Sequence, residues 1–396
     1  MLQLKWFFLL LCLGLVSSAH GLLNDLIIIK NHTRPGYDDN IFTRTSGNET
    51  GSYYVEQIVS IDAILSASQR QMLSTMYSPK FVWRDIDNKQ MLYHNWTTKL
   101  QYKPNFKSTI DVSHKWTVSE REPTDIDIDS DITWEQTQTD LQFSHTFSRK
   151  NSVVFGMTRK TKEWSENLLA VGEMYTDGDF EQYSANIHQI YEIWQGKLFW
   201  TYGIEAAHHE YVNDRGGFYG GDIYNNLMYV LGQSSILQLS YWYGHATTVL
   251  QGDDGEHETD GGGWGPSWKV SLNSQLSKNL MTGLSVSYET VDSSIAFWNS
   301  KDVYKAMVNA KYNITPKLET MSAFVLTDSR YLEDYDRNGT GLTREDILGV
   351  AICNFTYNIN RNHAAEINFM GFAMNPDDEV QGVARNKLTI GYRLTL

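Results

Sequence analysis

Apolar and polar residues alternate along most of this chain, and the final stretch, Lys387 to Leu396, shows the pattern most clearly. Its even-numbered positions from Leu388 to Leu396 are all apolar, whereas the positions between them are polar or small. A period of two places successive side chains on opposite faces of an extended strand. The stretch therefore predicts a strand with one apolar and one polar face.

The same alternation recurs in a series of arms, of which the hairpin from Ser267 to Thr290 is the clearest. Strands of soluble proteins average about 5 to 6 residues, whereas these arms keep the pattern over roughly ten, the length that a tilted strand needs to cross a bilayer. Tyr and Trp recur near the arm ends, as in the aromatic girdles of membrane barrels. The arms therefore favour a membrane protein over a soluble sheet.

Short turns and longer loops alternate along the sequence. Longer loops are acidic or rich in Gly, and the longest irregular piece is expected from Glu163 to Gln182. Short polar turns are predicted at Lys103 to Asn105, Ser148 to Asn151, Gln195-Gly196, Ser277 to Asn279, Asn313 to Lys317 and Asn360 to Asn362. This asymmetry is typical of outer-membrane barrels, which have short periplasmic turns and long external loops.

These features predict an all-β fold, a transmembrane antiparallel up-and-down β-barrel. Counting the arms gives about 18 strands, or about 16 if the segments at Leu26 and Asn225 do not pair. We expect Leu26 to Lys30 as a first short strand before a polar stretch from Asn31 to Gly51, and one strand carrying Leu73 to Trp83. An even number of strands would put both termini in the periplasm.

The first residues read as a cleavable secretory leader. Lys5 precedes an apolar run from Trp6 to Val16, and small residues follow at Ser17, Ala19 and Gly21. This run is too short to span a bilayer as a helix. We therefore expect a signal peptide over residues 1–21 and a single outer-membrane β-barrel domain over residues 22–396.

Composition narrows the function further. The formal net charge of −14 and the absence of a Lys and Arg cluster argue against a nucleic-acid partner. The two cysteines are Cys12, inside the leader, and Cys353, so the mature chain is not expected to form an internal disulfide. Strand pairing and burial must hold the fold.

The last strand resembles the closing strand of bacterial outer-membrane β-barrels, which usually ends in Phe where this chain has Leu396. The mature chain as a whole resembles the bacterial outer-membrane β-barrel porins often associated with exopolysaccharide gene clusters. The residues that carry this resemblance are the turns Ile314-Thr315-Pro316-Lys317 and Ile359-Asn360-Arg361-Asn362, the tract YSPKFVWRD and the Asp-rich loops. The resemblance implies a Gram-negative outer-membrane location, contact with lipid and lipopolysaccharide, recognition by the assembly machinery through the last strand, and a link to polysaccharide export.

A barrel of this strand number leaves a water-filled bore, and charges along a bore set its selectivity. The polar faces of the arms predict a pore-lining set of mixed sign, which favours neither anions nor cations and which would otherwise only solvate the wall. The set consists of Asp62, Lys99, Asp111, Lys115, Asp140, Glu205, Lys269, Glu289, Lys305, Lys311, Glu366, Lys387 and Arg393.

Three further stretches are candidate sites. Asp334 to Glu345 has the oxygen spacing of an EF-hand calcium loop, but Gly341 and strand-like flanks favour a solvated loop. The acidic tract from Gly252 to Gly265 could gate the pore or hold divalent ions that bridge lipopolysaccharide, but its composition favours a plain exposed loop. In His208-His209-Glu210, neighbouring side chains point to opposite faces of a strand, which disfavours a shared ion. We therefore expect no metal and no cofactor.

The sequence contains no G-x-S-x-G, no H-E-x-x-H and no other recognisable catalytic set. The function that it predicts is a porin-like passive channel for hydrophilic solutes rather than an enzyme. A non-conducting scaffold or plugged barrel, an outer-membrane hydrolase and a secreted carbohydrate-binding β-protein remain as alternatives.

Overall fold

The computed structural model describes residues 27–396 apart from residues 41–49, 69, 87, 89, 121–132, 165–178, 212–216, 233, 253–254, 260–265, 293–299, 332–343 and 377–382. The expected signal peptide lies outside these residues. No helix in the described part of the chain is long and apolar enough to cross a membrane.

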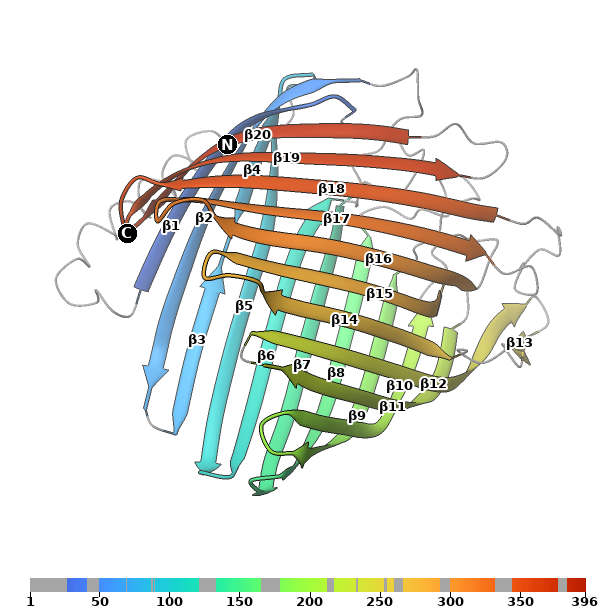
Figure 1. The fold of residues 1–396 in the computed structure, drawn as a ribbon. Coiled ribbons are helices and arrows are strands. Elements are labelled where there is room, and N and C mark those ends of the chain that lie inside the picture. The colour runs from blue at the N-terminus through green and yellow to red at the C-terminus, as the bar shows by residue number, and fades with distance from the viewer. Residues whose placement is uncertain are drawn as a thin grey trace.

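The described residues form one antiparallel sheet that closes on itself into a barrel (Figure 1). Its strand segments are β1 (Ile27–Asp38), β2 (Ser52–Ala67), β3 (Gln71–Tyr77), β4 (Lys80–Arg84), β5 (Gln90–Asn105), β6 (Ser108–Glu120), β7 (Thr133–Ser148), β8 (Asn151–Trp164), β9 (Phe180–Trp194), β10 (Leu198–Tyr211), β11 (Gly217–Leu231), β12 (Ser235–Gly252), β13 (Gly255–Thr259), β14 (Ser267–Gln275), β15 (Leu280–Asp292), β16 (Ser300–Asn313), β17 (Leu318–Tyr331), β18 (Arg344–Asn358), β19 (His363–Pro376) and β20 (Val383–Thr395).

The wall of the barrel has 18 strands. β3 and β4 share one position in the wall, because both pair with β2 on one side and with β5 on the other. Among the described residues, β13 pairs only with the last residues of β12, beyond the part that pairs with β14, and so adds no strand to the wall. The count of 18 predicted from the sequence is therefore confirmed, and the alternative of 16 is wrong, because the first segment pairs from Ile27 onward and the segment at Asn225 pairs as well.

The first and last strands close the barrel. β1 pairs with β2 on one side and with β20 on the other, and Ile29 and Leu396 exchange backbone hydrogen bonds of 3.0 and 2.7 Å. The ladder between β1 and β20 is interrupted at Arg34 and Pro35, because proline has no N–H to donate. Both ends of the described sheet lie at the end of the barrel that carries the short turns.

Three local expectations need correction. The first strand continues through the polar residues after Lys30 to Asp38, because pairing with β2 and β20 outweighs its low apolar content. The expected strand from Leu73 to Trp83 is broken at Ser78-Pro79, although Ser78 N and Pro79 O keep backbone hydrogen bonds to neighbouring strands. The turn expected at Lys103 to Asn105 comes later, at Phe106 and Lys107.

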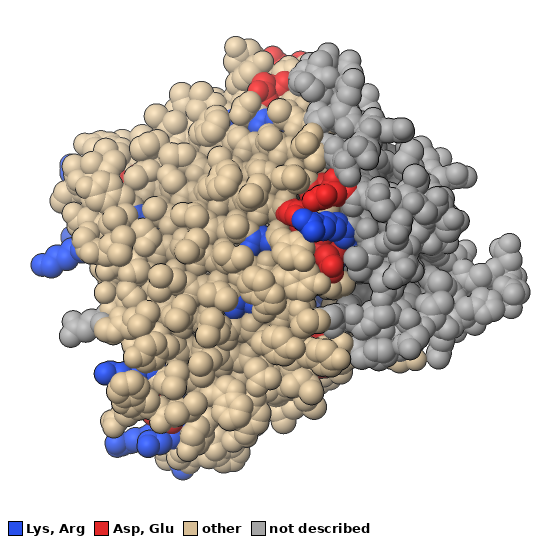
Figure 2. Space-filling view, turned by 45° about the vertical axis from the view of Figure 1, so that its right-hand side comes forward, with Lys and Arg blue, Asp and Glu red and all other residues tan. Residues whose placement is uncertain are grey.

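Each strand has an apolar outer face and a polar inner face. Large apolar side chains such as Ile204, Ile390 and Val308 stay exposed on the outside of the barrel, as a lipid-facing wall requires. Figure 2 shows this outer surface as a broad band with few charges between its two ends. The inner face carries many of the charged side chains, such as Glu366 and Lys387, and it also holds two buried apolar clusters, one around Phe372 and Val383 and the other around Val82 and Tyr93.

Candidate functional site

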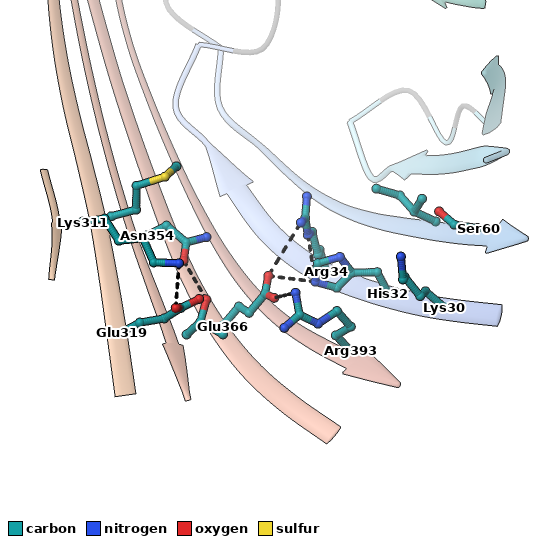
Figure 3. Close-up of a pocket in the computed structure, with 12 residues that line it drawn as sticks. Lys30, His32, Arg34, Ser60, Lys311, Glu319, Asn354, Glu366 and Arg393 are labelled. Atoms are coloured by element: carbon teal, nitrogen blue, oxygen red, sulfur yellow. Dashed lines mark hydrogen bonds and ion pairs between the residues drawn. The ribbon is translucent and has the colours of Figure 1, made fainter. Parts of the chain in front are cut away.

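The seam between the first and last strands brings a group of ionisable side chains together inside the barrel. Its centre is Glu366 of β19, whose side chain is only 4% exposed. His32 Nε2 lies 2.9 Å from Glu366 Oε2, and Arg393 Nη1 lies 3.1 Å from Glu366 Oε1. Arg34 Nη2 is 3.7 Å from Glu366 Oε2. One buried carboxylate is therefore surrounded by two guanidinium groups and an imidazole, as Figure 3 shows.

Local backbone structure makes this gathering possible. His32 and Arg34 follow one another on the inner face of β1 because side chains alternate along a strand. Gly391 of β20 leaves the space that they occupy, since a Cβ there would lie 3.3 Å from both Arg34 Cγ and His32 Nε2. The side chains can therefore reach across β20 to Glu366.

The cluster lines a cavity of about 390 Å³ that is open to the bore. Lys30 and Lys311 add two ammonium groups to its wall, and each is paired, Lys30 with Asp62 at 2.9 Å and Lys311 with Glu319 at 3.0 Å. Neutral polar atoms from Ser60, Asn354 and Thr356 complete the polar lining, and Ile58 and Met321 supply apolar contact. A small solute with an anionic group and several hydroxyls would find complementary partners here.

More ion pairs continue along the inner wall toward the long loops. The carboxylate of Glu56 lies 3.0 Å from Lys387 Nζ and 3.5 Å from Lys80 Nζ. Arg385 donates two hydrogen bonds from Nε and one from Nη2 to the carboxylate of Asp38, the shortest at 2.6 Å. Because both carboxylates are buried, the pairing keeps otherwise costly charges compensated.

Cations outnumber carboxylates on this side of the bore. Among the described residues, the inner faces of β1, β2, β4 and β16 to β20 carry ten Lys or Arg and six Asp or Glu side chains. We call the cationic ones the basic arc, which consists of Lys30, Arg34, Lys80, Arg84, Lys301, Lys305, Lys311, Arg385, Lys387 and Arg393. On the inner faces of β5 to β12, by contrast, the described residues carry five lysines and five carboxylates.

All residues of the predicted pore-lining set lie on the inner face of the barrel. Glu366, Arg393, Lys311, Asp62 and Lys387 belong to the side with the basic arc, and Lys305 lies on the same side. The others line the bore on β5, β6, β7, β10, β14 and β15, namely Lys99, Asp111, Lys115, Asp140, Glu205, Lys269 and Glu289. Glu205 is paired with His188 at 3.0 Å, and Asp140 accepts hydrogen bonds from Ser113, Gln138 and Thr158. Their effect on selectivity stays a prediction.

Sequence reasoning missed several members of the basic arc and its partners. Lys30, His32 and Arg34 were not included because the first strand was expected to end at Lys30. Continuing the period of two through IIIKNHTRPGYD would have placed all three on one face. Asp38, Glu56, Lys80, Glu319 and Arg385 were missed as well, and the same alternation on their strands assigns them to the inner face.

The other candidate sites fare differently. His208 and Glu210 point outward and approach each other to 3.8 Å, whereas His209 is buried on the inner side, stacked on Phe180. Glu345, the last residue of the calcium-loop pattern, lies 3.4 Å from Arg330 Nε, and most of that loop and of the acidic tract at Gly252 to Gly265 lies outside the described residues. Within the described part of the chain, no group of three or more His, Cys, Asp or Glu could hold a metal ion.

Known proteins resemble this chain in structure but not in sequence. No protein-family model matches the chain, and no curated protein matches its sequence. The crystal structure of Acinetobacter baumannii OccAB4 is similar with a TM-score of 0.51 at 12% identity, covering 94% of this chain and 100% of that one. Pseudomonas aeruginosa OpdQ gives a TM-score of 0.52 at 12% identity, covering 93% of this chain and 99% of that one.

A third neighbour is Pseudomonas aeruginosa OccK2 (OpdF), whose crystal structure is a complex with glucuronate. It has a TM-score of 0.51 at 10% identity and covers 95% of this chain and 100% of that one. Identities this low show a shared fold only. The chain therefore has the fold of the outer-membrane Occ and Opd porins, a closed antiparallel barrel of 18 strands.

Proposed function

We propose that this protein is a porin-like channel of the bacterial outer membrane through which hydrophilic solutes pass passively, with a preference for solutes that carry an anionic group. The observation that carries the proposal is the excess of cations on the inner wall around Glu366, at a cavity open to the bore. The polar interior replaces the lipid barrier for the solute, and the apolar outer face anchors the barrel in hydrocarbon.

The basic arc supplies the preference. Its ammonium and guanidinium groups attract an anion from the bulk, because a cleft lined by an excess of one charge raises the local concentration of the opposite charge. Arginine is suited to carboxylates because its guanidinium presents two parallel donors. Since Arg34 and Arg393 are already shared with Glu366, a solute carboxylate would exchange partners with it rather than bind irreversibly, which a conducting site requires.

Two features of the comparisons support the proposal. The structural neighbours are porins rather than enzymes. One of them, OccK2, is seen with glucuronate, a sugar acid of the size and chemistry that the cavity near Glu366 could accommodate. We therefore take sugar acids and similar small carboxylates as the first solutes to examine. Polysaccharide export, which the resemblance alone implied, stays a prediction.

The remaining expectations belong to the same proposal. The outer-membrane location requires an N-terminal signal peptide, and the closing strand β20 would be the part that the assembly machinery recognises. Outer-membrane lipid and lipopolysaccharide would surround the exposed apolar wall.

The decisive experiment is conductance of the purified, refolded protein in a planar bilayer. We expect open channels, a reversal potential in a salt gradient that shows preference for anions, and partial block of the current by glucuronate. Arg393→Gln should weaken the glucuronate block, whereas Lys269→Gln removes the same charge on another part of the inner wall and should leave the block near the original level. If both substitutions weakened the glucuronate block equally, the cavity near Glu366 would not be the glucuronate-binding site.

A non-conducting barrel is the second candidate, and the packed interior favours it. Tyr54, Phe372 and Val383 face inward yet are 5% exposed or less, so other parts of the protein cover this region of the inner wall. The same bilayer experiment decides between the two functions, because a filled barrel would insert and give no conductance with any salt.

A further inference from the structure

The short turns at one end of the barrel carry basic residues and no acidic ones. Eight short turns join consecutive wall strands at this end, and seven of them contain Lys or Arg, whereas none contains Asp or Glu. We call these cations the turn ring, which consists of Arg70, Lys107, Arg149, Lys150, Lys197, Lys278, Lys317 and Arg361. Figure 2 shows Lys and Arg side chains projecting at this end of the molecule. The ring contrasts with a formal net charge of −14 for the whole chain.

The turn-ring cations differ from those inside the barrel in having no carboxylate partner. Several cations of the basic arc form ion pairs with carboxylates, namely those of Asp62, Glu56, Asp38, Glu319 and Glu366. Among the described residues, by contrast, no turn-ring side chain forms an ion pair, and all eight are exposed. Eight uncompensated charges therefore point out from one rim.

A second regularity places large apolar side chains next to these cations. In six turns an exposed apolar residue comes one to three positions before Lys or Arg. These residues are Phe106, Phe147, Trp194, Leu276, Ile314 and Ile359, and their exposed fractions run from 41% at Ile314 to 94% at Phe106. The pairing is direct in two turns, where Lys197 Nζ lies 4.4 Å from the ring centre of Trp194 and Lys107 Nζ lies 5.8 Å from that of Phe106.

An apolar residue followed by a cation fits the boundary between hydrocarbon and headgroups. Aromatic and aliphatic side chains lie at the level of the acyl chains, while the long stems of Lys and Arg let their charged ends reach the phosphate layer. A small anion in solution would contact the cation alone and would gain nothing from the neighbouring apolar side chain. A lipid with a negatively charged headgroup satisfies both members at once.

We propose that the turn ring is a binding surface for anionic phospholipid headgroups, such as phosphatidylglycerol, in the leaflet that the short turns face. This inference rests on the proposed membrane location but not on conduction. Each turn would hold a headgroup between its cation and its exposed apolar side chain. The ring as a whole would fix the depth of the barrel and enrich anionic lipid around this rim.

The inference can be tested by electron spin resonance on the full-length barrel, reconstituted into vesicles of phosphatidylethanolamine and phosphatidylglycerol that carry a spin-labelled form of either lipid. Each Lys near the membrane surface attracts negatively charged headgroups. We therefore expect the barrel to prefer spin-labelled phosphatidylglycerol over spin-labelled phosphatidylethanolamine by about two- to fourfold at low salt. The preference should fall as ionic strength shortens the Debye length.

A matched pair of variants then locates the preference. K107Q/K197Q/K278Q/K317Q neutralises four of the seven basic turns and should lower the preference by about half, because four turn-ring cations remain. K99Q/K115Q/K269Q/K305Q removes the same charge from inside the bore and should keep it. Folding of each variant is checked by its resistance to unfolding in detergent. If the turn variant does not fold, the decrease of the lipid preference of the unchanged protein with added salt tests the inference instead.

Two results would overturn the inference, namely no preference in the unchanged protein at low salt, or an equal loss in both quadruple variants. Absence of conductance with the lipid preference intact would count against the proposed channel alone, so the two proposals fail separately.

Discussion

The hydroxyl groups of Tyr54 and Thr389 lie 2.6 Å apart and join β2 to β20 across the strand between them. Both side chains are buried on the inner face, and the strand that they bridge is β1 at Gly36. A Cβ at Gly36 would lie 2.7 Å from the backbone oxygen of Leu388 and would also collide with the ring of Tyr54. The absence of a side chain at this one position lets the two ends of the sheet lock together.

We expect Gly36→Val to destabilise the barrel by about 1 to 3 kcal/mol, because an added side chain forces the wall and Tyr54 apart. Tyr54→Phe should cost about 1 kcal/mol, the value of one buried hydrogen bond. Urea unfolding of the protein in lipid vesicles measures both. Gly349→Ala is the control, since a Cβ there meets nothing nearer than 3.9 Å. A Gly36→Val barrel as stable as this control would contradict the locking role.

Glu366→Gln should make the channel more selective for anions. The change leaves His32, Arg34 and Arg393 without their shared carboxylate. Removing one charge alters the energy of an ion passing at about 4 to 8 Å in water by about 0.5 to 1 kcal/mol, which is about a two- to fivefold change in the permeability ratio. Reversal potentials in a salt gradient give that ratio.

The control for this change is Glu289→Gln, because Glu289 is an exposed carboxylate on the inner face of β15. It should produce a smaller shift than Glu366→Gln. Equal shifts would mean that only total lumen charge matters and that the grouping at the seam does not.

Gly391→Leu should weaken the block of the current by glucuronate and lower conductance. The new side chain would displace Arg34 and His32, each of which is 3.3 Å from the position of its Cβ, and would fill part of the cavity at Glu366. Single-channel recording measures both effects. Gly371 of β19 lies on the outer face, with its nearest contacts at 3.4 Å, so Gly371→Val should leave the current unchanged.

Cysteine labelling tests the inside and outside of the wall directly. In a chain without Cys12 and Cys353, Ser287→Cys should react with a charged, water-soluble thiol reagent, because Ser287 faces the bore between Lys269 and Lys305. Val286→Cys should stay unreactive in vesicles and react after denaturation, because its side chain faces outward. If both cysteine variants reacted in the membrane-embedded protein, the apolar face would be in contact with water and not with lipid.

The sequence alone determined the fold class and the face of the wall for charged residues such as Lys269, Glu289 and Arg393, whereas the choice between 18 and 16 strands needed the pairing of β1 and β11. These properties follow from the period of two, which is local: from Lys269 to Glu289 or from Lys387 to Arg393, each side chain is placed by its own strand. Turn residues such as Gln195-Gly196 were also readable, because Gly196 has a φ of 66° that glycine adopts without strain.

The tertiary structure alone decided which charged residues meet. Nothing local relates His32 to Glu366, or Asp38 to Arg385, because these contacts arise only when β1 pairs with β20 and the barrel closes. The extent of β1 through Asp38 and the break at Ser78-Pro79 also depend on neighbouring strands, whose backbone groups compensate for a weak local pattern. Alternation along a strand determines the face on which each residue lies, whereas the closure and register of the barrel determine its partners, which are distant in the sequence.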